Sequence, residues 1–133
     1  GSPAPAQAAA PAVKYAKTAQ KATNAQRAKR DLVTLKTNKC LRRYAVKQAK
    51  AKAKRRKIWH QDLGVVLRQC NLSSVGENVA SGYQSGTRVV NQGWMTSEGH
   101  RANILRREYR LGVVAGRRDA SGRWYAAQLF GRR

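Results

Sequence analysis

The sequence predicts an α+β fold, in which helices pack on a small antiparallel sheet. Apolar residues at helical spacing dominate the first part of the chain, whereas two extended segments joined by a turn signal lie near its C-terminus. Hydrophobic residues make up 41% of the 133 residues, which is enough for one core. The length fits one domain of ordinary size.

An N-terminal tail is expected to precede a domain that covers residues 24–133. Gly1-Ser2 resembles the scar of a cleaved tag. Residues 3–13 are uncharged, rich in Pro and Ala, and typical of a linker. Residues 14–23 fit either a frayed helix or a basic arm, because no apolar stripe is strong enough to decide between the two.

Two helices are expected before residue 58. Asn24 is in position to cap the first, which runs to Leu35, and Asn38 to cap the second, which runs to about Lys57. Their apolar stripes are Ala25, Ala28, Leu32 and Leu35 in the first helix, and Leu41, Tyr44, Ala45 and Ala49 in the second. The small alanines of the second stripe allow another element to approach closely.

Between residues 71 and 105 the pattern changes from loop to strand and then to helix. Residues 71–74 are typical of a loop, and residues 75–82 of extended or irregular chain. Thr87 is in position to cap a third helix with Val90 and Trp94 on one face and Val89 beside them, and residues 100–105 suit a short helical turn.

The C-terminal segment predicts a β-hairpin. Residues 110–117 and 123–130 have the composition of strands, and residues 119–122 supply the turn between them.

The charge is large and uneven along the chain. There are 28 Lys and Arg residues against 6 Asp and Glu, a net charge of +22. Residues 1–60 carry 17 basic side chains and one acidic side chain, whereas residues 61–133 carry 11 and five. This balance admits an anionic partner and argues against a strongly basic one.

The densest basic run has two interpretations. It consists of Lys50, Lys52, Lys54, Arg55, Arg56 and Lys57. One interpretation is a docking face for polymers that carry phosphate or carboxylate groups, and the other is a solvated helix face that keeps the protein soluble. Like charges that lie close together on a helix repel each other, at a cost of about 0.2–0.5 kcal/mol per pair. This cost weighs against the interpretation in which the basic run has no binding role.

The chain contains two cysteines, Cys40 and Cys70, which are either two free core thiols or one disulfide. Neither a CxxC spacing nor a zinc-finger spacing is present. A bridge would close a loop of about 30 residues and stabilise the fold by about 3–4 kcal/mol in the chain-entropy model. We expect the disulfide, which implies an oxidising, extracytoplasmic setting. No run of about 18 apolar residues suggests a membrane span.

Two histidines and two acids are the residues suited to chemistry. His60 and His100 are the only histidines, and Glu77 and Glu98 lie between them in sequence. Imidazole and carboxylate are suitable ligands for a borderline metal such as zinc, and the same groups can act as general acids and bases. The spacing does not force them together, and the alternative for Glu77 and Asn78 is a polar network that holds a loop in place.

Three segments resemble a known family. They are Gly76-Glu77-Asn78-Val79-Ala80, the run from Trp94 to Leu105, and Tyr109-Arg110-Leu111-Gly112-Val113. Together they are similar to the bacterial branch of the CAP superfamily, which groups cysteine-rich secretory proteins, antigen 5 and plant pathogenesis-related proteins. The resemblance covers about residues 24–131, because the earlier helical spacing and the ending 124–131 also agree with the family.

The resemblance implies an α-β-α sandwich with a small antiparallel sheet between helices and a central cavity open to solvent. Many members line this cavity with two histidines and two glutamates, and some bind a divalent metal there. His60, Glu77 and His100 match the family pattern, whereas Ser97 occupies the position of the second glutamate and Glu98 is its neighbour. The resemblance also implies secretion, but it implies no particular reaction.

These observations predict a secreted, non-enzymatic binding module with a His/Glu cavity and a basic face for an anionic surface. The expected cavity residues are His60, Glu77, Asn78, Ser97, Glu98 and His100, with His60 and His100 as the ligands of a divalent metal such as zinc. The expected partners of the basic face are cell-wall polymers, lipid headgroups or acidic glycans.

Two alternative functions remain at this point. One is a metal-assisted hydrolase, in which the histidines hold the ion and Glu77 or Glu98 activates water. The other is non-specific nucleic-acid binding, which the charge would favour at low salt. Few aromatic residues lie among the cations, and no nucleic-acid recognition motif is evident.

Overall fold

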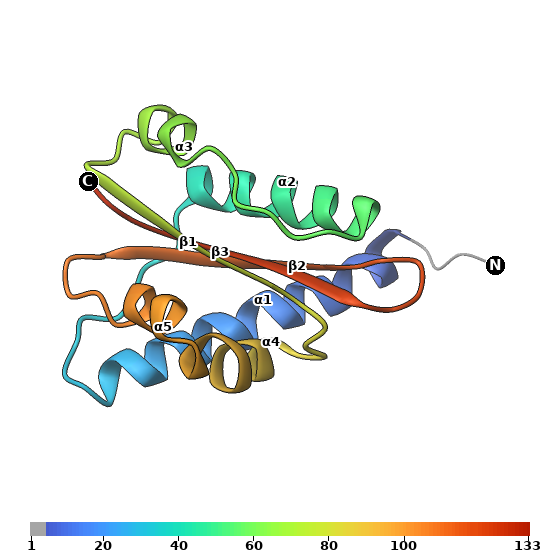
Figure 1. The fold of residues 1–133 in the computed structure, drawn as a ribbon, viewed down its shortest axis with the longest axis horizontal. Helices are drawn as coiled ribbons and strands as arrows, with labels where there is room; N and C mark the ends of the chain where they lie inside the picture. The colour runs from blue at the N-terminus through green and yellow to red at the C-terminus, as the bar shows by residue number, and fades with distance from the viewer. Residues whose placement is uncertain (1–4) are drawn as a thin grey trace.

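The computed structural model of the protein describes residues 5–133, and it confirms the expected α+β fold (Figure 1). The expected tag scar at Gly1-Ser2 lies outside these residues. The elements in chain order are α1 (Pro5–Ala28), α2 (Lys39–Arg55), α3 (Leu63–Gln69), β1 (Ser74–Ser81), α4 (Gly86–Arg88), a π-helical turn (Val89–Gly93), a 3₁₀ turn (Trp94–Thr96), α5 (Glu98–Ile104), β2 (Leu111–Arg118) and β3 (Trp124–Arg132).

The three strands form one antiparallel sheet in the order β1-β3-β2. The central strand, β3, is buried over residues 124–131. Helices α2 and α3 lie on one side of the sheet, and α1, α4 and α5 lie on the other, so the molecule is a three-layer α-β-α sandwich (Figure 1). Two apolar clusters fill the spaces between the layers: one lies under α2 around Leu41 and Leu129, and the other lies against α1 around Trp94 and Phe130.

The first helix differs from the sequence-based expectation. The prediction of a helix from Asn24 to Leu35 is wrong, because α1 begins at Pro5 and ends at Ala28. Helix α1 therefore includes residues that were expected to form a linker or an arm. Tyr15 and Ala19 are buried, and the Tyr15 ring stacks on Trp124 with the ring centroids 4.3 Å apart. A Cβ on Gly86 would collide with the carbonyl oxygen of Tyr15, so α4 approaches α1 very closely. These tertiary contacts define the helix, and its own apolar stripe is weak.

Asn24 therefore has a role other than capping. It lies near the C-terminal end of α1, and its side chain donates a hydrogen bond to the carbonyl oxygen of Leu35 (3.0 Å) and accepts one from the amide of the same residue (2.8 Å). This pairing holds the extended segment that leaves α1, in which Asp31 has a left-handed φ of 57°.

The second helix agrees with its prediction. The side chain of Asn38 accepts a hydrogen bond from the Leu41 amide (2.9 Å), and Leu41, Ala45 and Ala49 are fully buried. A disulfide joins Cys40 at the start of α2 to Cys70 at the end of α3, which confirms the expected bridge.

Smaller differences between the structure and the sequence-based prediction occur in the second half of the chain. Helix α3 was not predicted, and the cap of α4 is Ser85 rather than Thr87, because the Ser85 hydroxyl accepts a hydrogen bond from the Arg88 amide (3.1 Å). The expected third helix is a short α-turn followed by π and 3₁₀ turns, which bury Val90 and Trp94. The hairpin is confirmed, with each strand starting one residue later than predicted.

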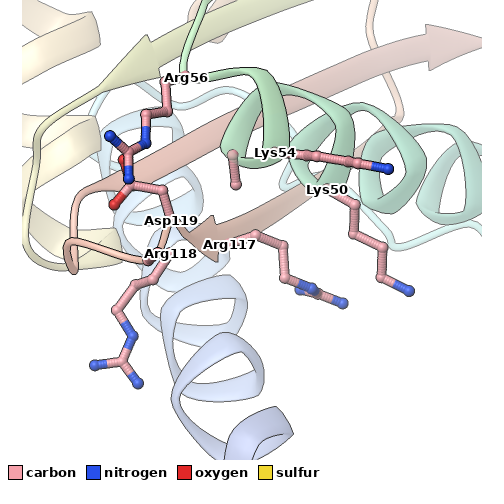
Figure 2. A pocket seen from close by; sticks show the side chains of 8 residues that line it. Lys50, Lys54, Arg56, Arg117, Arg118 and Asp119 are labelled. Atoms are coloured by element: carbon pink, nitrogen blue, oxygen red, sulfur yellow. The ribbon is translucent and has the colours of Figure 1, made fainter.

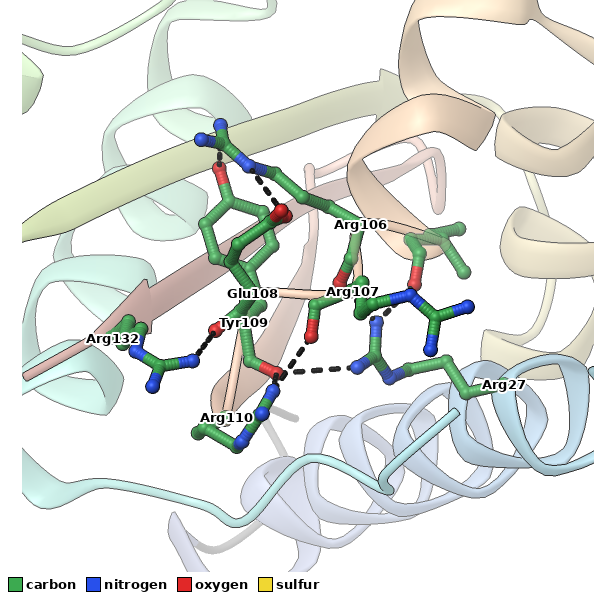
Figure 3. A network of polar contacts seen from close by, with 8 residues as sticks. Arg27, Arg106, Arg107, Glu108, Tyr109, Arg110 and Arg132 are labelled. Atoms are coloured by element: carbon green, nitrogen blue, oxygen red, sulfur yellow. Dashed lines mark hydrogen bonds and ion pairs between the residues drawn. The ribbon is translucent and has the colours of Figure 1, made fainter. Parts of the chain in front are cut away.

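A buried arginine connects α1 to the segment that follows α5. Arg27 is fully buried, and its guanidinium donates hydrogen bonds to four carbonyl oxygens. Figure 3 shows the guanidinium facing the segment that contains Arg106 and Tyr109. The acceptors are those of Val33 (2.7 Å), Ile104 (2.9 Å), Arg106 (2.8 Å) and Tyr109 (3.2 Å). Burial lowers the pKa of Arg27, and the charge of Arg110 adds to this effect, but a guanidinium stays protonated in proteins. The network fixes the path of the chain into β2.

Among the residues that the structure describes, no helix has the length and apolar character needed to cross a membrane.

Candidate functional site

Glu77 on β1 is one of the residues expected to line the cavity. Its side chain is fully buried, and its Oε1 lies 3.0 Å from Nδ1 of His60 and accepts a hydrogen bond from the Gln61 amide (3.2 Å). The other oxygen, Oε2, accepts a hydrogen bond from Nε2 of Gln61 (2.6 Å). Both carboxylate oxygens thus have partners in the segment between α2 and α3, and Glu77 holds that segment against β1.

Asn78 points to the opposite face of β1, as successive residues of a strand do. Its Nδ2 donates to the carbonyl oxygen of His100 (3.0 Å) and to Oε1 of Gln128 (3.1 Å), and its Oδ1 accepts from Nδ2 of Asn103 (2.9 Å). Gln128 in turn donates to the Thr23 hydroxyl (2.9 Å). This is the polar network that the residue types suggested, and it fixes α5 and α1 to the sheet.

The two histidines differ in environment. The His60 side chain is 61% exposed, whereas His100 on α5 is only partly exposed. Burial of the imidazole lowers the pKa of His100 below its ordinary value, and the charge of His60 adds a smaller effect in the same direction.

The remaining expected cavity residues are less closely connected. Ser97 precedes α5 without a side-chain capping bond, and Glu98 is exposed in the first turn of that helix. Within residues 5–133, no three His, Cys, Asp or Glu side chains come close enough together to hold a metal ion. The histidines and Glu77 thus do not form a ready three-ligand site, and zinc binding stays a prediction.

A second candidate site lies where the end of α2 meets the β2–β3 hairpin (Figure 2). A cavity of about 410 Å³ opens there, and we call it the basic pocket. Its charged lining residues are Lys50, Lys54, Arg56, Arg117, Arg118 and Asp119. Lys50 and Lys54 are four residues apart on α2 and project from the same side of the helix, next to Arg117 (Figure 2).

The single acid of the basic pocket is already engaged. The Asp119 side chain is only 3% exposed, and its Oδ1 accepts hydrogen bonds from the Ser121 hydroxyl (2.7 Å), the Ser121 amide (2.8 Å) and the Arg123 amide (3.0 Å). The other oxygen, Oδ2, lies 3.8 Å from Nε of Arg56. The hydrogen bond from the Ser121 hydroxyl, together with those from the Arg123 and Ser121 amides, lowers the pKa of Asp119, so this carboxylate is ionised at neutral pH. It shapes the hairpin and leaves the other cations uncompensated.

Lys52 was expected on the basic face, and the structure buries it instead. It follows Ala49 by three positions and precedes Ala53, so it lies on the buried stripe of α2. Its Nζ donates to Oε1 of Gln48 (3.0 Å) and lies 4.4 Å from the centre of the Trp59 ring. Burial lowers the pKa of Lys52, and the charge of Glu77 partly opposes this.

The other expected cations, Arg55 and Lys57, are exposed near the end of α2, and the Arg55 guanidinium lies 5.5 Å from the centre of the Trp59 ring. Sequence reasoning missed Arg117 and Arg118, which lie about 60 residues beyond the basic run. The available signal was the adjacent arginine pair next to the hairpin turn. Arg118 also stacks over Trp124 at 5.3 Å from the ring centre.

Comparison with protein families identifies one match. The model of the cysteine-rich secretory protein family, CAP, matches residues 20–130. A comparison with curated proteins found no match.

Solved structures share the fold. The chain is similar to an extracellular protein with an SCP domain from Bacillus anthracis, with a TM-score of 0.83, 22% identity, and coverage of 100% of this chain and 45% of that protein. It is similar to an outer surface protein of Borrelia burgdorferi, with a TM-score of 0.79, 21% identity, and coverage of 88% of this chain and 91% of that one. It thus spans less than half of the Bacillus protein but most of the Borrelia protein.

Two further structures extend this comparison. A cysteine-rich secretory protein from Staphylococcus aureus has a TM-score of 0.70 and 19% identity, with coverage of 92% of this chain and 39% of that one. NaASP2, solved with Zn²⁺, has a TM-score of 0.54 and 10% identity, with coverage of 89% of this chain and 77% of that one. At these identities the similarity concerns the fold.

Proposed function

The chain belongs to the cysteine-rich secretory protein family, CAP, and on this basis we propose that it is a secreted, non-enzymatic binding module. In this proposal it docks on a polyanionic surface through the basic pocket. The surface is a polymer or membrane that carries closely spaced phosphate, sulfate or carboxylate groups.

The observation that carries this proposal is the convergence of cations from two elements. Lys50, Lys54 and Arg56 come from the end of α2, and Arg117 and Arg118 come from β2, around one acid that is engaged in the hairpin. A single exposed ion pair contributes about 0–1 kcal/mol, so one cation would bind an anion weakly. Several cations around one cavity bind a multivalent anion better, and arginines add bidentate hydrogen bonds.

Secretion is supported by the disulfide and by the relatives. A structural disulfide between Cys40 and Cys70 is typical of oxidising compartments. The Bacillus relative is described as extracellular, and the Borrelia relative as an outer surface protein.

The His/Glu cavity is proposed as a separate, secondary site. His60 and His100 are the candidate ligands for zinc, which would act as a Lewis acid when bound. Glu77 is poorly suited to activating water, because its oxygens accept hydrogen bonds from Gln61 and lie against His60. Its observed contacts instead favour a positioning role, and the hydrolase alternative gains no support from them.

The proposed docking is tested by charge reversal with a matched control. The Lys50→Glu/Lys54→Glu variant changes two exposed cations of the basic pocket, and Arg101→Glu/Arg107→Glu makes the same change in net charge elsewhere on the surface. Binding is measured at physiological salt to immobilised teichoic acid, to a sulfated glycan and to vesicles containing phosphatidylglycerol. We expect the pocket variant to lose at least about tenfold in affinity for one of these ligands, and the control to lose less than about threefold.

Equal losses in the two variants would show that only the net charge matters and would refute the proposal. Tight binding to DNA at the same salt, with an equal or greater loss in the pocket variant, would favour the nucleic-acid alternative. Circular dichroism of each variant verifies that it is folded.

A further inference from the structure

A further cavity lies where α1 meets α4 and the β2–β3 hairpin, and we call it the α1–α4 pocket. Its volume is about 430 Å³, a size typical of pockets that hold small molecules. Polar side chains from three parts of the chain line it. They are Lys14 and Thr18 of α1, Gln84, Ser85 and Thr87 around the start of α4, and Arg118 at the end of β2.

The walls of the α1–α4 pocket are held together by close packing. The Tyr15 hydroxyl donates a hydrogen bond to the carbonyl oxygen of Tyr83 (3.1 Å), and Gly86 lies against α1 at a position where a Cβ would collide with the helix backbone. The Tyr15 ring also stacks on Trp124, and both aromatic side chains are buried. The fold itself therefore forms the pocket, and no ligand is needed to bring its walls together.

The charge of the α1–α4 pocket is positive. Lys14 and Arg118 are exposed, and none of the described residues that line the pocket is acidic. The Arg118 guanidinium lies over the Trp124 ring, and within residues 5–133 it forms no ion pair with a carboxylate. Its side chain extends away from Lys50 and Lys54 (Figure 2). Arg118 can therefore offer its donors to an anion in the α1–α4 pocket.

Neutral hydrogen-bonding groups lie beside these cations. The Ser85 hydroxyl accepts a hydrogen bond from the Arg88 amide (3.1 Å), which leaves its own hydrogen for donation to a ligand. Gln84 and Thr87 are exposed, and each side chain has both a donor and an acceptor. The pocket thus combines two cations with several groups that can exchange hydrogen bonds with hydroxyls.

We propose that the α1–α4 pocket binds an acidic sugar, a sugar ring that carries a carboxylate, either free or at the end of a glycan. Arg118 holds the carboxylate through two parallel hydrogen bonds, and Lys14 adds favourable charge. The side chains of Gln84, Ser85 and Thr87 exchange hydrogen bonds with the hydroxyls of the ring. A simple anion would leave these neutral groups unused, and a neutral sugar would leave the two cations without a partner.

This inference goes beyond the proposed docking on polyanionic surfaces, because it requires a single carboxylate together with neutral hydrogen-bonding groups. The probes are galacturonic acid and its methyl glycoside, which represents a sugar at the end of a glycan. Galactose keeps the hydroxyls of the ring but has no carboxylate, and acetate has a carboxylate but no hydroxyls. Binding to the full chain is followed by amide NMR at physiological salt.

We expect millimolar galacturonic acid to cause saturable shifts of the amides of residues 84–87 and 118, and galactose and acetate to bind at least about tenfold more weakly. Arg118→Gln should weaken binding of the acidic sugar by at least about tenfold. Gln84→Ala/Thr87→Val, which changes no charge, should weaken it by at least about threefold. Equal or tighter binding of the methyl glycoside would assign the site to the end of a glycan, and its loss would assign it to the free sugar.

Two control variants separate this site from the rest of the surface. Thr34→Val/Gln69→Ala changes two exposed residues of the same types elsewhere and should bind the sugar as the wild type does. Lys50→Glu/Lys54→Glu should change the affinity for the sugar by less than about threefold, although it weakens polyanion docking. Circular dichroism of each variant verifies that it is folded.

Equal affinity for acetate and galacturonic acid would overturn the proposal, because charge alone would then explain binding. Equal binding by the Gln84→Ala/Thr87→Val variant and its control would overturn it as well, and so would absence of saturation at about 100 mM sugar. Failure of polyanion binding would affect only the proposed function, since the sugar probes carry at most one charge.

Discussion

Lys52 and Lys54 are two positions apart on α2 and have opposite surroundings, which provides a matched test of the docking surface. Lys52 is buried over Trp59, whereas Lys54 lines the basic pocket. We predict that Lys54→Met weakens polyanion binding by about two- to fivefold. Lys52→Met should weaken it less and should not lower the free energy of unfolding, because an apolar side chain of similar length replaces a buried cation. Binding assays and urea unfolding of both variants measure these effects, and the reverse order would contradict the assignment.

Arg27 is the residue on which the path from α5 to β2 depends most. Its replacement by Met would remove the donor for four carbonyl oxygens, two of which are in fully buried hydrogen bonds. We predict a loss of about 3–5 kcal/mol in the free energy of unfolding, and a smaller loss for Arg27→Lys. Urea denaturation measures both. A loss below about 1 kcal/mol for the Met variant would show that water or rearranged backbone replaces the guanidinium.

His100 should make the free energy of unfolding depend on pH. Because folding lowers its pKa, the unfolded chain binds more protons than the native chain between the lowered value and the ordinary value of 6.5. The free energy of unfolding should therefore rise with pH through this window and fall as the pH drops below about 6.5. We predict a shallower decline for His100→Gln in urea unfolding at a series of pH values. An unchanged decline would assign the acid sensitivity to other groups.

At the scale of elements, the disulfide is the covalent link between α2 and α3. Its sequence separation of 30 residues predicts a loss of about 3–4 kcal/mol in the free energy of unfolding when Cys40 and Cys70 are both changed to Ser. Thermal and urea unfolding under non-reducing conditions measure the loss. The wild-type protein in reductant serves as a control and should behave like the double variant; a stable reduced protein would contradict the prediction.

How well each element was predicted depends on whether its signals are local. Helix α2 carries its own cap, Asn38, and its own buried stripe, so both its start and its inner face were predicted correctly. Helix α1 has a weak stripe of alanines, and its position depends on Trp124 and Gly86, which are far away in sequence. For the same reason Asn24 was assigned to a cap, although its true partner is the backbone of Leu35.

The prediction of the candidate sites was limited in the same way, by contacts between residues that are far apart in sequence. The contact between Glu77 and His60 involves residues that the family motif indicates, whereas the partner Gln61 and the network through Gln128 depend on the sheet register. Counting cations in the basic run could not identify the buried Lys52. It also could not include Arg117, which folding brings to the end of α2.

For the whole molecule, folding converts an uneven distribution of charge along the chain into an uneven distribution in space. Residues 1–60 carry 17 of the 28 basic side chains, and α1 and α2 lie within this part of the chain. These two helices border β2 on its two faces, and a second cavity of about 210 Å³, lined by Val114 and Arg117, lies next to the basic pocket. The residues expected to line the His/Glu cavity lie elsewhere, on β1, next to and on α5, and in the segment between α2 and α3.

The most direct test of the proposed docking is an amide NMR titration of the full chain with a short oligomer of the anionic polymer that binds best. We predict saturable shifts concentrated on residues 50–56 and 117–120, which border the basic pocket, with smaller changes around Lys17 and Lys21. Lys50→Glu/Lys54→Glu should abolish the concentrated shifts. Shifts spread evenly over the exposed cations, or concentrated around His60 and His100, would contradict the assignment of this pocket as the docking site.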